Sequence, residues 1–402
     1  MVDLLFVGAH LLGSSRVPAG TGWLSTEGGA IAALGAGAPP PAAAGGRQVV
    51  DVSGYTLMPG FIDVHVHGAL GHEAMDGNVP GLLTMASFFA SHGVTSFLPT
   101  TWTADRAETL RALEAIAEAV DTSTGAGAAG ARVLGAHMEG PYLSDVRCGA
   151  QDPHQVRGVD REEAAAFLDT GAVRLITVAP ESEGAGDLID ECVRRGVAVS
   201  IGHTDATYEQ VDAALARGAS HMTHAFNAMS PFSARVPGAV GAALALPGFD
   251  AEVIADDVHV HPGAVRALVR ARGLQEVVLV TDAIRPTGST GEQELTMAGR
   301  PVAVRDGAVR FPSGQLVGSV LTMDAALGNV RRATGLPLEE LWPIVSANPA
   351  RSAGVARSKG RLEVGMDADL VVVDDRHDGV RVVMTVVGGR IVPTAPGGAG
   401  GS

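Results

Sequence analysis

The sequence predicts an α/β fold: a (β/α)8 TIM barrel with a small β-sandwich domain built from both chain ends. In the middle of the chain, short apolar runs alternate with helical stretches, whereas both ends carry strand-like runs without helices. The composition is rich in Gly and Ala and only 4% aromatic, which favours α/β packing. We predict the small domain at 1–57 and 356–396, the barrel at 58–355 and a flexible tail at 397–402.

The two chain ends carry the strands of the small domain. The N-terminal part has short apolar runs separated by turns, at residues 4–7, 30–34 and 49–52. The C-terminal part repeats this pattern, at residues 370–373, 382–387 and 389–392. Because the two parts flank the rest of the chain, we expect them to pair into one module.

The barrel is predicted from eight successive apolar runs of strand length. These are FIDVHV (61–66), VTSFLP (94–99), RVLGAHM (132–138), RLITVA (174–179), VAVSIG (197–202), SHMTHA (220–225), AEVIA (251–255) and EVVLVT (276–281). Candidate helices lie between or after them, at 81–91, 105–120, 160–169, 186–195, 207–217, 262–272 and 323–334. Eight strands with helical connections are typical of a closed parallel barrel.

Charge and cysteine content exclude several classes of protein. The net charge of −15 repels polyanions and argues against nucleic acid as a partner. Cys148 and Cys192 are the only cysteines, too few for a disulfide framework or a cysteine zinc site. The N-terminus lacks early basic residues, and no apolar run approaches the roughly 20 residues that span a bilayer. We therefore expect a cytoplasmic protein that does not bind membranes.

Polar residues gather at the C-terminal ends of the predicted barrel strands. Asp63, His65 and His67 lie at alternate positions of the first strand and so project from one face. Other polar residues end the third, fifth, sixth and eighth strands: Glu139, His203, His221 with His224, and Asp282. In a barrel of this kind the C-terminal strand ends form one mouth, where catalytic groups gather.

These residue types are ligands of divalent transition metals. We predict His65, His67, Glu139, His203 and His224 as metal ligands, with Asp282 as the general base that accepts a proton from the attacking water. A lone histidine on a strand is more often a satisfied polar residue, and a lone aspartate after a strand is usually a helix cap. Burying so many charged groups without a ligand would, however, cost several kcal/mol or more.

Seven segments resemble the amidohydrolase superfamily and, within it, the family of N-acetylglucosamine-6-phosphate deacetylases. They are PGFIDVHVHG (59–68), HMEGPYL (137–143), GHTDA (202–206), HMTHAFNAM (221–229), IADDVH (254–259), VTDAI (280–284) and LVGSVLTM (316–323). They occur in order over nearly the whole chain, and the flanking β segments also fit that family.

This resemblance implies hydrolysis of the acetamide of N-acetylglucosamine 6-phosphate to glucosamine 6-phosphate and acetate. Glu139, His203 and His224 would hold the principal metal, and Asp282 would activate water and then protonate the leaving amine. Arg235 would bind the phosphate through a bidentate guanidinium pair. The substrate contacts implied by the family are Ala150, Gln151, Asn227, Ala228, Arg235, His259, Leu316, Val317 and Gly318. A homodimer is also implied.

The chain departs from the family pattern at one site residue. The number of metal ions also varies among members of the family. Gln151 stands where relatives have a histidine that contacts the substrate. Some family members lack the histidine pair that His65 and His67 form on the first strand, so the chain could bind one or two metal ions per subunit. Zinc is the metal we expect, with iron, manganese or cobalt as alternatives. Lys359, the only lysine, lies beyond the barrel, so a carboxylated lysine bridge is excluded and Glu139 takes that role.

Two other functions stay open at this point. The first is another enzyme of the superfamily, such as a deacetylase of the galactosamine 6-phosphate isomer, a D-aminoacylase or a dihydropyrimidinase-like hydrolase. The absence of a barrel lysine argues against the last. The second is a catalytically dead barrel that serves as a binding module, although every predicted ligand and the base are present.

Overall fold

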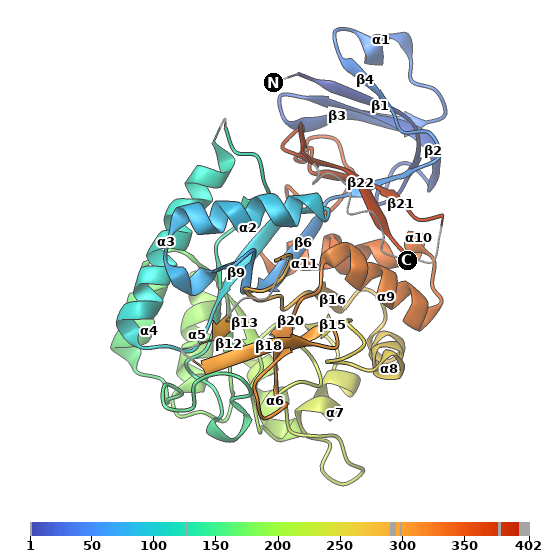
Figure 1. Ribbon diagram of the computed structural model, residues 1–402. Helices are drawn as coiled ribbons and strands as arrows, with labels where there is room; N and C mark the ends of the chain where they lie inside the picture. Colours follow the sequence, from blue (N-terminus) through green and yellow to red (C-terminus); the bar gives the residue numbers. More distant parts are fainter. Residues whose placement is uncertain (1, 126, 290–294, 298–299, 377–378, 394–402) are drawn as a thin grey trace.

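The computed structural model describes residues 2–125, 127–289, 295–297, 300–376 and 379–393. A sheet built from both chain ends lies at the top of Figure 1, where blue and red strands run side by side above the barrel. The predicted tail at 397–402 lies outside the described residues. In the described part of the chain, no helix has the length and apolarity needed to cross a membrane.

Eight strands from the chain ends form one hydrogen-bonded sheet. Five come from the start of the chain: β1 (Leu4–Leu11), β2 (Gly20–Glu27), β3 (Ala30–Ala36), β4 (Gln48–Asp51) and β5 (Thr56–Pro59). Three come from its end: β21 (Leu370–Asp374), β22 (Arg381–Val387) and β23 (Arg390–Val392). The order is β23-β22-β21-β5-β1-β2-β3, with β4 beside β1, so the antiparallel pair β21–β5 joins the two ends. The second, sheet-rich unit predicted from both ends is thereby confirmed.

This terminal sheet curls around its own apolar core. Phe6, Leu24, Leu57 and Val372 are fully buried together on its inner face. At the far side, the backbone N–H of Ile31 in β3 donates to a carbonyl just before β21, so the sheet nearly closes. Strand β2 was not predicted, because its sequence GTGWLSTE carries two glycines and little apolar alternation. A short helix, α1 (Pro41–Ala44), lies between β3 and β4.

Eight parallel strands form the barrel, as predicted. They are β6 (Phe61–Val66), β9 (Val94–Thr101), β11 (Ala136–Glu139), β12 (Val173–Val178), β13 (Ala198–Ile201), β14 (His221–Met222), β15 (Asp250–Ile254) and β16 (Val277–Val280). The ring closes between the last and the first strand, where Asp282 N donates to His65 O at 2.9 Å. Beside this bond, Thr281 Oγ1 donates to Asp63 Oδ2 at 2.6 Å, which assigns Asp63 to barrel closure.

Two predicted strands are interrupted or end early in the structure because of the backbone conformation. The run 132–138 is divided into β10 (Arg132–Val133) and β11, because Gly135 between them has φ +136° and sits against the carbonyl of Ala172. The run 220–225 keeps only His221–Met222 as strand, because the backbone turns to positive φ at His224. In both places the backbone bends and interrupts the hydrogen-bonded pairing with the neighbouring strand.

A helix follows each barrel strand. They are α2 (Val79–Ser91), α3 (Arg106–Thr124), α4 (Arg161–Asp169), α5 (Ala185–Arg195), α6 (Tyr208–Ala216), α7 (Gly238–Ala245), α8 (Pro262–Arg272) and α9 (Met323–Thr334). Side chains of Asn78, Asp105, Asp160 and Thr207 cap α2, α3, α4 and α6. Helix α7 was not predicted, because its sequence GAVGAALA has no polar face to reveal a helical period. The short helices α10 (Leu338–Leu341) and α11 (Ala347–Ser352) follow α9.

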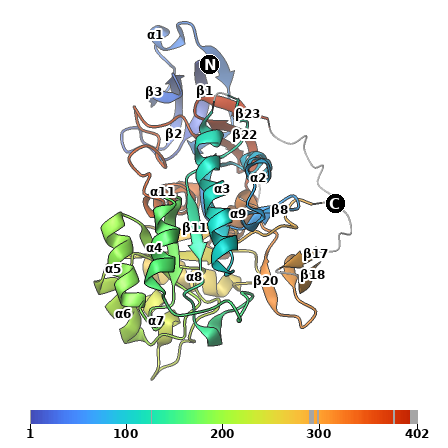
Figure 2. The same cartoon turned by 90° about the vertical axis from the view of Figure 1, so that its left-hand side faces the viewer.

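An antiparallel sheet between β16 and α9 was not predicted either. Its strands are β17 (Leu295–Met297), β18 (Arg300–Arg305), β19 (Ala308–Arg310) and β20 (Leu316–Ser319). Figure 2 shows β17 and β18 projecting beside the barrel. The sheet packs on Trp102 and Ile284 through Val309, Phe311 and Val317, so it forms one wall of the barrel mouth. A small pair, β7 (Gly68–Ala69) and β8 (His72–Glu73), lies after the first strand.

Candidate metal centre and cavity

Six predicted side chains meet at the C-terminal end of the barrel. Glu139, at the end of β11, lies between the others. Its Oε1 is 3.1 Å from Nε2 of His203 and 3.1 Å from Nε2 of His224. Those two imidazole nitrogens are themselves 3.1 Å apart. Three donor atoms from three separate strands therefore surround one point.

The first-strand histidines and Asp282 form the adjoining half of the centre. His65 Nε2 lies 3.4 Å from Glu139 Oε1 and 3.5 Å from Asp282 Oδ1. His67 Nε2 lies 3.4 Å from Glu139 Oε2 and 3.3 Å from Asp282 Oδ1. Glu139 thus faces both groups of histidines, as a carboxylate shared between two cations would.

Backbone geometry turns three of these side chains inward. His203, His224 and Asp282 directly follow or lie just beyond strands β13, β14 and β16, and they have φ values of +46°, +27° and +49°. Non-glycine residues rarely adopt this left-handed conformation, which costs on the order of 1–3 kcal/mol. The surrounding hydrogen bonds maintain it at three strand ends on the same side of the barrel, a clustering that is typical of functional sites.

Hydrogen bonds fix which nitrogen of His67 and of His203 faces the centre. His67 Nδ1 donates to the carbonyl of Thr100 at 3.1 Å, and His203 Nδ1 donates to the carbonyl of Arg147 at 3.0 Å. A carbonyl can only accept, so in the neutral rings the lone pair lies on Nε2. The ring of His67 also stacks on Trp102, with centroids 3.7 Å apart. These rings are therefore preorganised to present Nε2 to a cation.

The donor set fits a divalent transition metal. His65 Nε2 and His67 Nε2 are buried and have no hydrogen-bond partner, although both point at the carboxylates of the centre. Leaving buried polar atoms unsatisfied is costly, and a coordinated cation would satisfy them. Imidazole and carboxylate ligands in this number suit zinc, iron, manganese or cobalt.

Electrostatics keep the two carboxylates of the centre ionised. Burial raises the pKa of Glu139, but His65, His203 and the hydrogen bonds from His203 and His224 outweigh it and hold that pKa well below its usual range. Burial likewise raises the pKa of Asp282, and the charges of His65 and His67 bring it below its ordinary value. Asp282 is therefore a carboxylate at neutral pH, the form that accepts a proton.

A cavity of about 190 Å³ opens over this centre. Its wall contains most residues that the family resemblance assigned to the site: Glu139, Ala150, Gln151, His203, His224, Asn227, Ala228, His259, Asp282, Leu316 and Val317. His65 and His67 lie beneath it and are fully buried. His259 is fixed by Asp256, whose Oδ2 lies 2.6 Å from His259 Nδ1.

Two expected substrate residues lie elsewhere. Arg235 is exposed on the loop between β14 and α7, and it is not among the residues that line the cavity. Gly318 is buried behind the wall, where an added Cβ would lie 3.2 Å from the carbonyl oxygen of Asp282. Gly318 therefore supports the backbone of Asp282 instead of facing the cavity.

Gln151 lines the cavity but is already occupied by protein partners. Its Nε2 donates to Glu139 Oε2 at 2.5 Å, and its Oε1 accepts from the backbone N–H of Thr103 at 2.7 Å. The side chain is only 2% exposed. An amide bridges these two groups well, because it both donates and accepts.

Sequence reasoning missed three residues of the wall: Trp102, Gly149 and Gln315. Trp102 directly follows the second barrel strand. Its position at a strand end, like those of Glu139 and Asp282, is the sequence signal that could have identified it. Gln315 lies in the connection between β19 and β20 of the unpredicted sheet, and its Nε2 donates to the Gly149 carbonyl at 2.6 Å. No local pattern in the sequence reveals that contact.

Comparison with known proteins agrees with this geometry. The amidohydrolase family model matches residues 56–392. The chain is 40% identical over 338 residues to N-acetylglucosamine-6-phosphate deacetylase from Vibrio furnissii, which covers 84% of this chain and 82% of that protein. It is 35% identical over 372 residues to N-acetylgalactosamine-6-phosphate deacetylase from Escherichia coli O157:H7, covering 91% and 95%.

A solved structure gives the same result for the whole fold. The crystal structure of N-acetylglucosamine-6-phosphate deacetylase from Pasteurella multocida matches with a TM-score of 0.88 at 30% identity, covering 97% of this chain and 99% of that one. The likeness thus includes both the barrel and the sheet built from the chain ends. The chain therefore belongs to the amidohydrolase family, and it shares most of its length with the N-acetylglucosamine-6-phosphate deacetylases.

Proposed function

We propose that this protein is a metal-dependent hydrolase that converts N-acetyl-D-glucosamine 6-phosphate into D-glucosamine 6-phosphate and acetate. One observation carries the proposal: Glu139 Oε1 is shared by His203 and His224 on the floor of a cavity that also exposes Asp282. Relatives that align with more than four fifths of the chain carry this activity in their names.

The proposed metal is zinc, with iron, manganese or cobalt as alternatives, at one or two sites per subunit. Glu139, His203 and His224 would hold the principal cation, and His65 and His67 a second one with Glu139. When bound, a divalent cation supplies Lewis acidity, which polarises a carbonyl and lowers the pKa of a nearby water.

Asp282 is the proposed general base and acid. Its ionised carboxylate takes a proton from the water that attacks the acetyl carbonyl. After attack it returns this proton to the amine nitrogen, and the C–N bond breaks. His259, held by Asp256, would donate a hydrogen bond to the acetyl carbonyl or anchor a sugar hydroxyl.

The remaining wall residues would position the sugar phosphate. Asn227, Ala228, Ala150 and Val317 supply backbone and side-chain contacts in the family-based assignment, together with Gln151 and Leu316. Arg235 would reach the phosphate only from its exposed loop, within its own subunit or across the proposed homodimer. A cytoplasmic location also remains part of this proposal.

Product analysis tests the proposed function. Purified protein is incubated with N-acetylglucosamine 6-phosphate, with and without a chelator, and both acetate and free amine are measured. We expect equal amounts of the two products, loss of activity in the chelator and recovery on adding zinc. Absence of products from the metal-loaded protein would refute the assignment.

The galactosamine 6-phosphate isomer is the second candidate substrate. The 35% identity with the Escherichia coli N-acetylgalactosamine-6-phosphate deacetylase, over 91% of this chain, favours including it. Comparing kcat/KM for the two phosphorylated epimers and for unphosphorylated N-acetylglucosamine separates the readings. We expect the glucosamine epimer to be preferred and the unphosphorylated sugar to be a poor substrate.

A further inference from the structure

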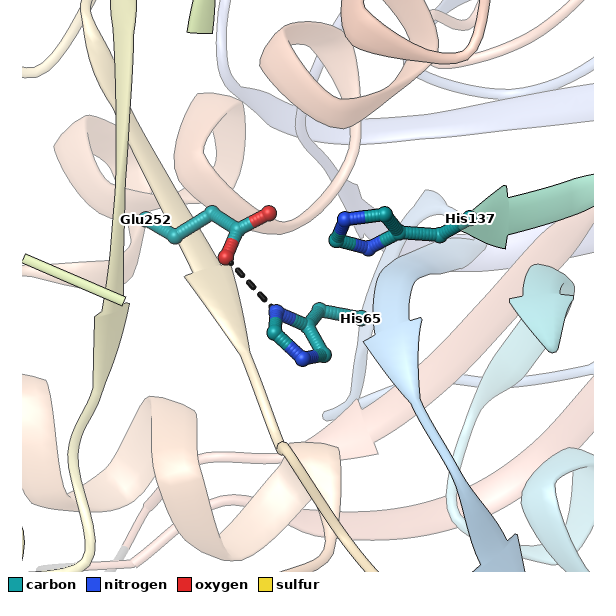
Figure 3. Close-up of side chains that lie close together, drawn as sticks. All are labelled: His65, His137 and Glu252. Atoms are coloured by element: carbon teal, nitrogen blue, oxygen red, sulfur yellow. Dashed lines mark hydrogen bonds and ion pairs between the residues drawn. The ribbon is translucent and has the colours of Figure 1, made fainter. Parts of the chain in front are cut away.

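A buried polar cluster lies inside the barrel below the metal centre. Figure 3 shows Glu252 from β15, His65 from β6 and His137 from β11 directed toward a common space, with Glu252 bonded to His65. All three side chains are fully buried, and their ligand atoms lie close enough to suggest a further cation site. The hydrogen bonds of the cluster assign it a different role.

His137 has no nitrogen free for a cation. Its Nδ1 donates to the carbonyl of Val64 at 3.0 Å, so its Nε2 accepts from the hydroxyl of Thr177 at 2.7 Å. That hydroxyl in turn accepts from Thr223 Oγ1 at 2.7 Å.

Glu252 is surrounded by hydrogen-bond donors. Its Oε1 accepts from His221 Nε2 at 3.0 Å. Its Oε2 accepts from the backbone N–H of His224 at 2.9 Å and from His65 Nδ1 at 2.9 Å. The proton on Nδ1 leaves the lone pair of the neutral His65 ring on Nε2, the atom that faces Glu139 and Asp282.

We propose that Glu252 is a positioning residue of the metal centre, which fixes the tautomer and ring direction of His65 from below. The same carboxylate fixes the left-handed segment at His224, so one side chain supports a residue in each half of the centre. Carbonyls do this for His67 and His203, whereas His65 depends on Glu252. This inference rests on the proposed function in taking His65 as a metal ligand.

Metal affinity, measured by competition with a chelator, tests the proposal. Glu252→Met keeps the size of the side chain but removes the acceptor, so we expect 10- to 100-fold weaker cobalt or zinc binding. Glu252→Gln should bind within about threefold of the parent protein. In this variant the amide oxygen would replace the Glu252 oxygen that accepts from His65 Nδ1 and the His224 N–H. The amide NH₂ group would donate to His221 Nε2. Thr177→Val is the matched control, since it removes an equally buried hydroxyl whose hydrogen bonds go to His137 and Thr223 and to none of the proposed ligands.

The outcomes separate this proposal from the function beneath it. Unchanged affinity in Glu252→Met, or an equal loss in Glu252→Gln and Glu252→Met, would overturn the positioning role. If Glu252→Met does not fold, Glu252→Asp decides: it keeps the charge but withdraws the acceptor by one methylene, so binding at the parent level would overturn the proposal. A parent protein that binds no metal would instead refute the proposed function.

Discussion

At the scale of single residues, Glu139 organises the site by using its two oxygens differently. Oε1 faces His203 and His224, whereas Oε2 accepts from Gln151 and faces His67. A carboxylate held in this way has one defined orientation, and preorganised charge of this kind is what metal binding and catalysis require. Asp282 has a free face toward the cavity, which suits a residue that must exchange protons.

Asp282→Asn should abolish most turnover while leaving the metal bound. An amide cannot accept the proton of water, and the loss of a general base costs on the order of 10²- to 10⁴-fold in rate. Turnover on N-acetylglucosamine 6-phosphate and metal content per chain are measured together. Asp187→Asn, in an exposed ion pair with Arg161, is the control. Near-normal turnover in Asp282→Asn would remove Asp282 from this role.

Gln151→Leu should weaken metal binding, because Glu139 then loses the donor to its Oε2 and the N–H of Thr103 loses its acceptor. Outer partners of metal ligands are worth about 10- to 100-fold in affinity, and we expect a loss in that range. Chelator competition measures it, with Gln155→Leu in the same loop as control. If Gln151 only contacted the substrate, the variant would have a raised KM and an unchanged metal affinity. That result would contradict our prediction.

At the scale of elements, β20 holds the backbone of Asp282, the proposed general base. Ser319 N donates to the Asp282 carbonyl at 2.9 Å, and Ser319 Oγ donates to the Thr281 carbonyl at 2.6 Å. The same strand places Leu316 and Val317 in the cavity wall. The β17–β20 sheet thus connects the cavity wall to the end of the eighth barrel strand.

Gly318→Val should lower turnover without removing metal. A Cβ at this position would lie 2.6 Å from Ile284 Cγ2 and 3.2 Å from the Asp282 carbonyl oxygen, so the segment must shift. Misplacing a catalytic group by about 1 Å can cost roughly 10²-fold in rate. Steady-state kinetics and metal content test this, and Gly127→Val, in open space, is the control. Unchanged kcat would show that β20 tolerates the added side chain without moving Asp282.

At the scale of the whole molecule, a charge cluster lies where the segment before β21 meets β10 of the barrel sheet. Lys359 Nζ lies 2.8 Å from Asp367 Oδ2 and also bonds Asp369, and its side chain is only 5% exposed. Arg132 of β10 donates to Asp367 at 3.0 Å, and Asp369 accepts from the backbone N–H of Gly388 at 2.7 Å. The single lysine of the chain is therefore a structural residue at this junction.

Lys359→Met should destabilise the protein without changing the site. Removing one partner of a buried ion pair leaves the other charge uncompensated, at a cost of about 3–5 kcal/mol. Urea or thermal unfolding measures the loss, and kcat/KM at low temperature should stay at the parent level. Arg357→Met, at an exposed position two residues earlier, is the control. Equal stability of the two variants would contradict a structural role for Lys359.

The sequence by itself determined the barrel, the pairing of the chain ends and the residues that meet at the barrel mouth. The strand ends can be predicted from local apolar runs. Because parallel strands in a barrel have their C-terminal ends on one side, the sequence predicts that residues as distant as His65 and Asp282 lie close together. The sequence did not predict helix α7 or the β17–β20 sheet. The α7 segment is rich in Gly and Ala and the strands of the sheet are short, so neither shows a clear hydrophobic periodicity.

Only the tertiary structure decided what individual residues do within that frame. Asp63 closes the barrel, Gln151 bridges Glu139 and Thr103, Gly318 supports Asp282, and Glu252 orients His65. Each role depends on a hydrogen bond or a close contact between residues more than 10 positions apart, and in most cases more than 30. The type and spacing of residues along a chain limit which side chains can meet, but the direction of a ring nitrogen or an amide depends on packing from every side.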